Sequence, residues 1–101
     1  MADEAVAARL ASAQPAVPVR CAYLELQQPD VAAAAADLVR AGARHISLVP
    51  MFLGTGKHAR ADLPRLLDLL RANHAGVQFR LQPPVGEDPR VLDLLAAIAL
   101  E

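Results

Sequence analysis

The apolar residues of this chain follow two alternating periods, and this alternation limits the possible folds more than any other feature. Segments with apolar residues at every second position, or in an unbroken run, predict strands near residues 17–24, 45–52 and 77–82. Segments with a three-to-four-residue period predict helices near residues 3–13, 30–41, 62–73 and 88–99. Strands that alternate with helices favour right-handed crossovers and a parallel sheet. We therefore expect an α/β protein with three layers, α/β/α, around a parallel sheet.

Local signals mark where the predicted helices begin and end. Asp30, Asp62 and Asp88 each stand at the expected start of a helix, where a carboxylate can accept hydrogen bonds from free backbone N–H groups. Pro89 follows Asp88 at the first helical position, where its missing N–H costs nothing. Gly42 is the expected stop of the second helix. These signals predict four separate helices.

Length and composition exclude several classes of protein. A chain of 101 residues suits one domain over residues 1–101. A net charge of −1 and 3% aromatic residues give no basis for nucleic-acid binding. The sequence contains no apolar run of about 18 residues, so no membrane span is predicted. The single cysteine, Cys21, cannot form an intrachain disulfide, so we expect a reducing compartment, the cytoplasm.

Two reactive side chains follow predicted strands. Glu25 comes after the first strand, and His58 ends a glycine-containing loop after the second. Ligands in open parallel sheets bind beyond the carboxyl ends of the strands, so we expect Glu25 and His58 to face one crevice. A neutral imidazole binds divalent transition metals, and a carboxylate can add a second ligand. The alternative is that His58 is a solvated loop residue. We expect structural roles for the other two histidines, His45 at the start of a strand and His74 at the end of a helix.

The loop of residues 54–58 also suggests phosphate binding. A Walker loop requires a glycine five positions before the Gly-Lys pair and a hydroxyl residue after the lysine. Met51 and His58 occupy those positions, so the motif is not met. A simpler phosphate-binding module that uses Gly54–Lys57 stays open as an alternative.

Several segments together resemble one family. The sequence V-P-M-F-L-G-T-G-K-H at 49–58, followed by D-L-P at 62–64, resembles the central motif of the small CbiX/SirB-type sirohydrochlorin chelatases. A-Y-L-E at 22–25 with Pro29 is similar to the family segment A-F-L-E…P. G-E-D-P at 86–89 is similar to the closing motif G-x-[DH]-P. The resemblance covers nearly the whole chain in the same order.

The resemblance implies a function and a set of site residues. The family inserts cobalt or iron into sirohydrochlorin, in cobalamin or sirohaem synthesis, on a chelatase-like fold that is often a homodimer. It implies that His58 and Glu25 are the catalytic and metal-site residues. Lys57 and Arg60, which flank the histidine, are expected to pair with substrate carboxylates. The divalent metal is a substrate, and no organic cofactor is expected.

One family segment is missing from this sequence. The family's first strand ends in H-G-S-R-[DE]-P, and its histidine supplies the other half of the metal site. The 101 residues contain no such motif. We expect the chain either to start late relative to the functional product or to be a non-catalytic relative that binds metal or tetrapyrrole. Metal insertion by this form alone is expected to be slow or absent, and the chain is not expected to be a stable monomer.

Overall fold

The computed structural model describes residues 2–23, 30–53 and 57–101. Two compact units divide the chain, Met1–Arg44 and His45–Glu101. The first contains α1 (Ala2–Ala13) and α2 (Val31–Arg40), and the second contains β1 (His45–Leu48), α3 (Lys57–Asn73), β2 (Gln78–Leu81), the 3-10 helix η1 (Val85–Glu87) and α4 (Pro89–Ala99). A single domain over all 101 residues stays a prediction. Among the helices in the described ranges, none combines the length and apolar character needed to cross a membrane.

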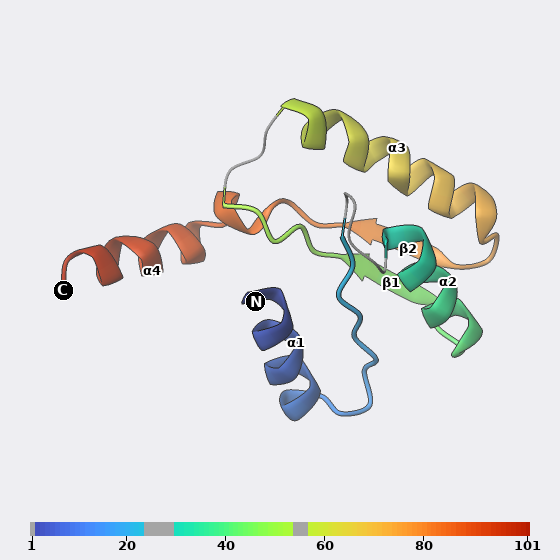
Figure 1. The fold of residues 1–101 in the computed structure, drawn as a ribbon, viewed down its shortest axis with the longest axis horizontal. Coiled ribbons are helices and arrows are strands. Elements are labelled where there is room, and N and C mark those ends of the chain that lie inside the picture. The colour runs from blue at the N-terminus through green and yellow to red at the C-terminus, as the bar shows by residue number, and fades with distance from the viewer. Residues whose placement is uncertain (1, 24–29, 54–56) are drawn as a thin grey trace. The chain divides into compact units, whose positions relative to one another are not determined.

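In the second unit, β1 and β2 form a parallel pair (Figure 1). Ile46 stands opposite Phe79, and Leu48 stands opposite Leu81. The chain passes from β1 to β2 through α3, which packs against β2. The α/β class and the parallel pairing predicted from the alternating pattern are therefore confirmed, although both strands are shorter than the segments 45–52 and 77–82.

The core of the second unit is formed where α3 covers the strand pair. Its buried side chains are Ile46, Leu63, Leu70 and Phe79. Leu63 and Leu70 are one helical repeat of seven residues apart, so they lie on one face of α3. Arg71 reaches from the same helix to the edge of β2, where its guanidinium donates a hydrogen bond of 3.1 Å to the Phe79 carbonyl. Apolar packing and this bond together attach α3 to the sheet.

The first unit confirms two of the expected helices. The carboxylate of Asp30 caps α2 by accepting a hydrogen bond of 2.8 Å from the Ala33 N–H. Gly42 follows the helix with a φ of 101°, the left-handed geometry that glycine accepts most readily. The residues buried in α2 are Ala34 and Ala35. Small side chains thus supply the closest-packed face of this unit.

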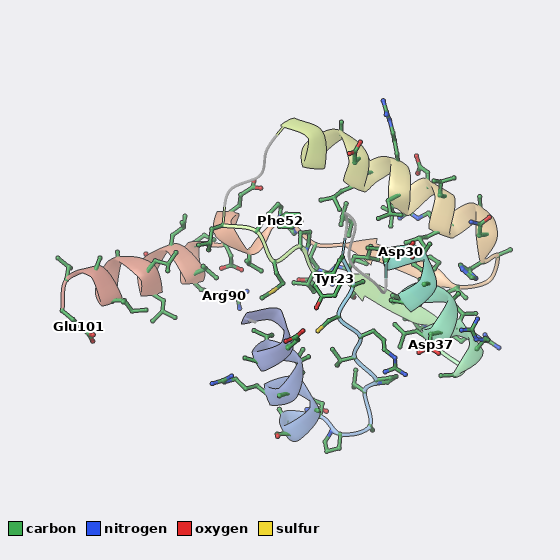
Figure 2. The ribbon with its side chains drawn as sticks, viewed as in Figure 1. Tyr23, Asp30, Asp37, Phe52, Arg90 and Glu101 are labelled. Carbon is green, nitrogen blue, oxygen red and sulfur yellow. The ribbon has the colours of Figure 1, made fainter. Side chains whose placement is uncertain are left out.

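The strand predicted over residues 17–24 is wrong for the described part, residues 17–23. Instead of a strand, the backbone makes one isolated parallel bridge, between Tyr23 and Asp30 (Figure 2). Pro18 has no N–H to give to a ladder, and alternating apolar residues become a strand only when a neighbouring strand pairs with them. The segment is attached through side chains instead, by Arg20 to Asp37 at 2.8 Å and by Tyr23 to Glu4 at 3.1 Å.

The start of the third helix also differs from the prediction. We expected the helix to begin after Asp62, with Lys57 and His58 in a loop, but α3 begins at Lys57. Residues 57–61 are Lys, His, Ala, Arg and Ala, four of which are good helix formers. Pro64 consequently lies inside the helix, where it has no N–H for the carbonyl four residues earlier. The segment with His58 is therefore the first turn of a helix.

Candidate functional site

The carboxyl ends of β1 and β2 lie at the same edge of the sheet because the strands are parallel. Beyond this edge the two chain segments stay side by side. The Gln82 N–H donates to the Leu48 carbonyl at 2.9 Å, and the Val85 N–H donates to the Pro50 carbonyl at 3.0 Å. The Gly86 N–H then donates to the Phe52 carbonyl at 2.9 Å. The segment after β1 is thus held in an extended form up to Phe52.

Pro84 explains why the second strand ends while this pairing continues. Pro50 lies two residues after Leu48, so the residue that would continue the ladder is two residues after Gln82, which is Pro84. Proline has no N–H to donate, and the next residue, Val85, donates to Pro50 in its place. The chain then turns into η1, which leads directly into α4. Pro84 therefore ends the regular pairing with the segment after β1, at the edge of the sheet where the site is expected.

His58 is the second residue of α3, shortly after this extended segment. Lys57 is the first residue of the helix and Arg60 is the fourth, so three of the four predicted site residues lie in the first helical turn. The backbone of this turn is described, and the side chains lie outside what the structure describes. The free backbone N–H groups of a first helical turn make it favourable for negative charge.

Glu25 lies outside the described residues. Its convergence with His58 on one crevice, and the role of both residues in binding a metal, therefore stay predictions. Within the ranges that are described, no group of three or more His, Cys, Asp or Glu side chains is arranged to hold a metal ion.

An apolar hollow of about 280 Å³ lies beside the carboxyl end of β2. Its walls come from α3, from the last residue of β2 and from the segment that follows: Leu63, Pro64, Leu81, Gln82, Pro83, Pro84 and Glu87. Sites that enclose a small molecule typically measure about 300–1,000 Å³, so this hollow is large enough for one part of a ligand. Gln82 and Glu87 are the polar residues among those that line it.

The closing motif G-E-D-P forms a helix cap. The Asp88 carboxylate accepts hydrogen bonds from the Arg90 N–H at 2.8 Å and from the Arg90 guanidinium at 3.0 and 2.7 Å. Hydrogen bonding to the Arg90 guanidinium is the main cause that lowers the pKa of Asp88 from 3.8 to about 2. Arg90 is labelled at the start of α4 in Figure 2. The cap and the following Pro89 confirm the predicted start of this helix.

The other two histidines have the structural positions expected from the sequence. His45 is the exposed first residue of β1. His74 follows the end of α3, and its N–H donates to the Leu70 carbonyl at 3.0 Å. Its ring also lies 6.0 Å from that of Phe79, at a tilted angle. Both are therefore suitable controls for experiments on His58.

One residue of this region was missed by sequence reasoning. The sequence indicates Gly86 only as part of the segment that is similar to the closing motif G-x-[DH]-P. In the structure it lies directly against the backbone of Leu53, the last described residue before Lys57. The signal in the sequence was a glycine at the end of a proline-rich turn, but the contact joins segments more than 30 residues apart and no local pattern predicts it.

Comparison with known proteins identifies the family of this α/β chain. The family model CbiX matches residues 2–101. The chain belongs to the CbiX family.

Two relatives with established names illustrate the range of the family. The sirohydrochlorin ferrochelatase of Bacillus subtilis (strain 168) is 34% identical over 77 residues, which cover 75% of this chain and 30% of the relative. The sirohydrochlorin cobaltochelatase of Sulfurisphaera tokodaii is 30% identical over 77 residues, covering 76% of this chain and 61% of the relative. The matched region thus spans less than two thirds of either relative.

Solved structures show the same likeness in three dimensions. A CbiX protein of cobalamin (vitamin B12) biosynthesis from Marinobacter aquaeolei VT8 superimposes with a TM-score of 0.75 and 28% identity, over 95% of this chain and 80% of that one. SirB from Bacillus subtilis with Fe3+ gives a TM-score of 0.71 and 29% identity, over 93% of this chain and 38% of that one. The chain therefore has the fold of these CbiX and SirB proteins.

Proposed function

We propose that this protein inserts a divalent metal, Co2+ or Fe2+, into sirohydrochlorin. The observation that carries the proposal is the position of His58 in a CbiX-family chain. His58 is the second residue of α3, which begins shortly after the segment held at the carboxyl edge of the parallel sheet. This edge is where α/β sheets bind their ligands. The names of the two relatives, a ferrochelatase and a cobaltochelatase, support the substrate and leave the choice of metal open.

Metal insertion replaces two pyrrole N–H protons of the macrocycle with one divalent ion. The protein must therefore bring a partly dehydrated metal to the ring and accept protons. In this proposal His58 is the metal ligand or the proton acceptor, since a neutral imidazole can serve in either role near pH 7. Glu25 is proposed as the second ligand or the proton relay.

Lys57 and Arg60 are proposed to bind the substrate. Sirohydrochlorin has many carboxylate groups, and both cations belong to the same helical turn as His58. The free N–H groups of this turn add to the attraction for negative charge. The apolar hollow between α3 and the segment after β2 is proposed to contact the edge of the macrocycle.

The test is an insertion assay. Purified protein is mixed with sirohydrochlorin and Co2+ or Fe2+, and insertion is measured from the change in visible absorption against the rate without protein. Because the 101 residues contain no H-G-S-R motif, we expect the protein to raise the rate only slightly, and His58→Ala to remove that rise. His74→Ala is the matched control and should keep it, because His74 follows the other end of the same helix. An equal increase from wild type and His58→Ala would contradict the proposal.

The alternative function is binding without insertion. A non-catalytic relative would bind cobalt or the tetrapyrrole and would leave the insertion rate unchanged. The same assay separates the two functions if metal binding is measured in parallel. Binding that requires His58, with no increase in the insertion rate, would favour the alternative.

We also propose that the protein forms a homo-oligomer in the cytoplasm, with the 101 residues as one domain. Support for self-association comes from α4, whose residues Leu92, Leu94 and Ile98 are more than half exposed. Clusters of exposed large apolar side chains are typical of interaction surfaces. Light scattering at micromolar concentration tests this, and a compact folded monomer would contradict it. The cytoplasm is supported by the single cysteine.

A further inference from the structure

Gly86 makes the closest backbone approach found at a described glycine. A Cβ atom added at Gly86 would come within 2.6 Å of the Leu53 Cα, and closer still to the carbonyl carbon and oxygen of Leu53. All three atoms belong to the backbone, so no side-chain rotation could relieve the overlap. Any other residue at position 86 would therefore displace the backbone of Leu53.

The need for glycine here is a matter of space. Gly42 and Gly76 have positive φ angles, and a Cβ added to either would have nothing within 4 Å. Gly86 has no positive φ, and its N–H is used in the hydrogen bond to Phe52. Position 86 thus requires a missing side chain, whereas positions 42 and 76 require an unusual backbone conformation.

The displaced atoms lie next to the helix that contains His58. Leu53 is separated from Lys57, the first residue of α3, by three residues. Four residue steps span at most about 14 Å of fully extended chain. A shift of the Leu53 backbone is therefore transmitted through a short length of chain to the first turn of α3. The second contact that fixes this point is the bond from Gly86 to Phe52, one residue before Leu53.

We propose that Gly86 is a positioning residue for His58. By donating to Phe52 and by leaving room for the Leu53 backbone, Gly86 fixes the point from which the chain leaves for the helix that begins at Lys57. This proposal rests on the proposed function, in which His58 is the residue that needs exact placement. Misplacing a catalytic group by about 1 Å can lower a rate by roughly 100-fold.

The test compares Gly86→Ala with wild type by NMR of the histidine ring protons. The chain has three histidines, so His45 and His74 serve as internal references for His58. We expect Gly86→Ala to shift the His58 signals and to leave those of His45 in place. Cobalt affinity should fall by about 10-fold or more, the usual effect of disturbing groups that support a ligand. The matched control is Gly76→Ala, which strains the backbone without touching Leu53 and should leave the His58 signals unchanged.

The possible outcomes separate this proposal from the proposed function. If wild type binds no cobalt, the metal role of His58 fails, while the ring signals still decide the role of Gly86. A folded Gly86→Ala protein with unchanged His58 signals and unchanged cobalt affinity would overturn the proposal. If Gly86→Ala does not fold, hydrogen exchange in wild type decides. Slow exchange of the Gly86 amide supports the contact with Phe52, and exchange at the rate of an unstructured peptide would overturn it.

Discussion

The two units of the chain use different interactions to fix their non-helical segments. In His45–Glu101, the pairing of β1 and β2 continues past both strands through backbone bonds to Pro50 and Phe52. In Met1–Arg44, the segment before α2 has one isolated backbone bridge, between Tyr23 and Asp30, and is also attached by side chains, with Arg20 bonded to Asp37 and Tyr23 to Glu4. Backbone pairing fixes the path of a chain at each residue, whereas exposed side-chain bonds fix it at isolated points. We infer that the carboxyl edge of the sheet is the more rigid of the two regions.

The two units also differ in the size of their buried side chains, which are larger in the second unit. The second unit buries Ile46, Leu63, Leu70 and Phe79, and the first buries Ala34 and Ala35. A large apolar side chain contributes about 1.5–3 kcal/mol when it is fully buried, and an alanine contributes far less. The free energy of unfolding should therefore depend mainly on the second unit, and the following predictions test this difference.

The largest effect is expected at Leu70, which is 2% exposed. Leu70→Ala should lower the free energy of unfolding by about 2–5 kcal/mol, because it leaves a cavity between α3 and β2. The neighbouring Leu69 is 61% exposed and provides the control. Leu69→Ala should change the stability by less than about 0.5 kcal/mol. Urea unfolding measures both, and equal losses in the two variants would contradict the assigned core.

The second prediction concerns the cap of α4 and its dependence on pH. The pKa of Asp88 is about 2 in the folded protein against an ordinary value of 3.8, so the folded state favours the ionised carboxylate. This contribution is complete above about pH 4 and is lost as the pH falls toward 2. The helix content measured by circular dichroism should fall in that pH range, by more than the protonation of the other carboxylates causes. Asp88→Asn should lose less helix content in that pH range. An identical loss in wild type and Asp88→Asn would rule out the cap of α4 as the cause of the loss.

The smallest effect on stability is expected in the first unit. Hydrogen bonding to the Arg20 guanidinium is the main cause that lowers the pKa of Asp37, with Arg40 a weaker contributor at 3.7 Å. Arg20→Gln should raise the pKa of Asp37 toward its ordinary value, and Arg40→Gln should raise it less. Stability should change little, because the pair is exposed and is screened by salt. NMR titration of the Asp37 carboxyl measures both shifts, and a larger rise in Arg40→Gln would reverse the assignment.

Sequence reasoning succeeded where the determining interactions are local. The caps at Asp30 and Asp88 and the turn at Gly42 each depend on residues within a few positions, and all three were predicted. The parallel pair was also predicted, because an apolar run and an alternating run separated by a helix have few other arrangements. The family resemblance rested on contiguous motifs, which a sequence displays directly.

The errors arose where the outcome depends on distant partners or on competing local signals. Residues 17–23 have a strand pattern, but pairing with another segment decides whether a strand forms. The start of α3 had two possible signals, the cap residue Asp62 and the helix formers from Lys57 onward, and the longer helix prevailed. The contact between Gly86 and Leu53 joins the segments that follow the two strands, which no local pattern reveals. The joint site of Glu25 and His58 stays a prediction.

The most direct test of the central claim, that His58 binds the metal to be inserted, is a cobalt titration. Wild type, His58→Ala and His74→Ala are titrated at a pH near 7 and again near pH 5, where histidine is mostly protonated. We expect wild type and His74→Ala to bind cobalt equally, with weaker binding at the lower pH because metal and proton compete for the ring. His58→Ala should show no comparable binding at either pH. Equal cobalt binding by wild type and His58→Ala would contradict the claim.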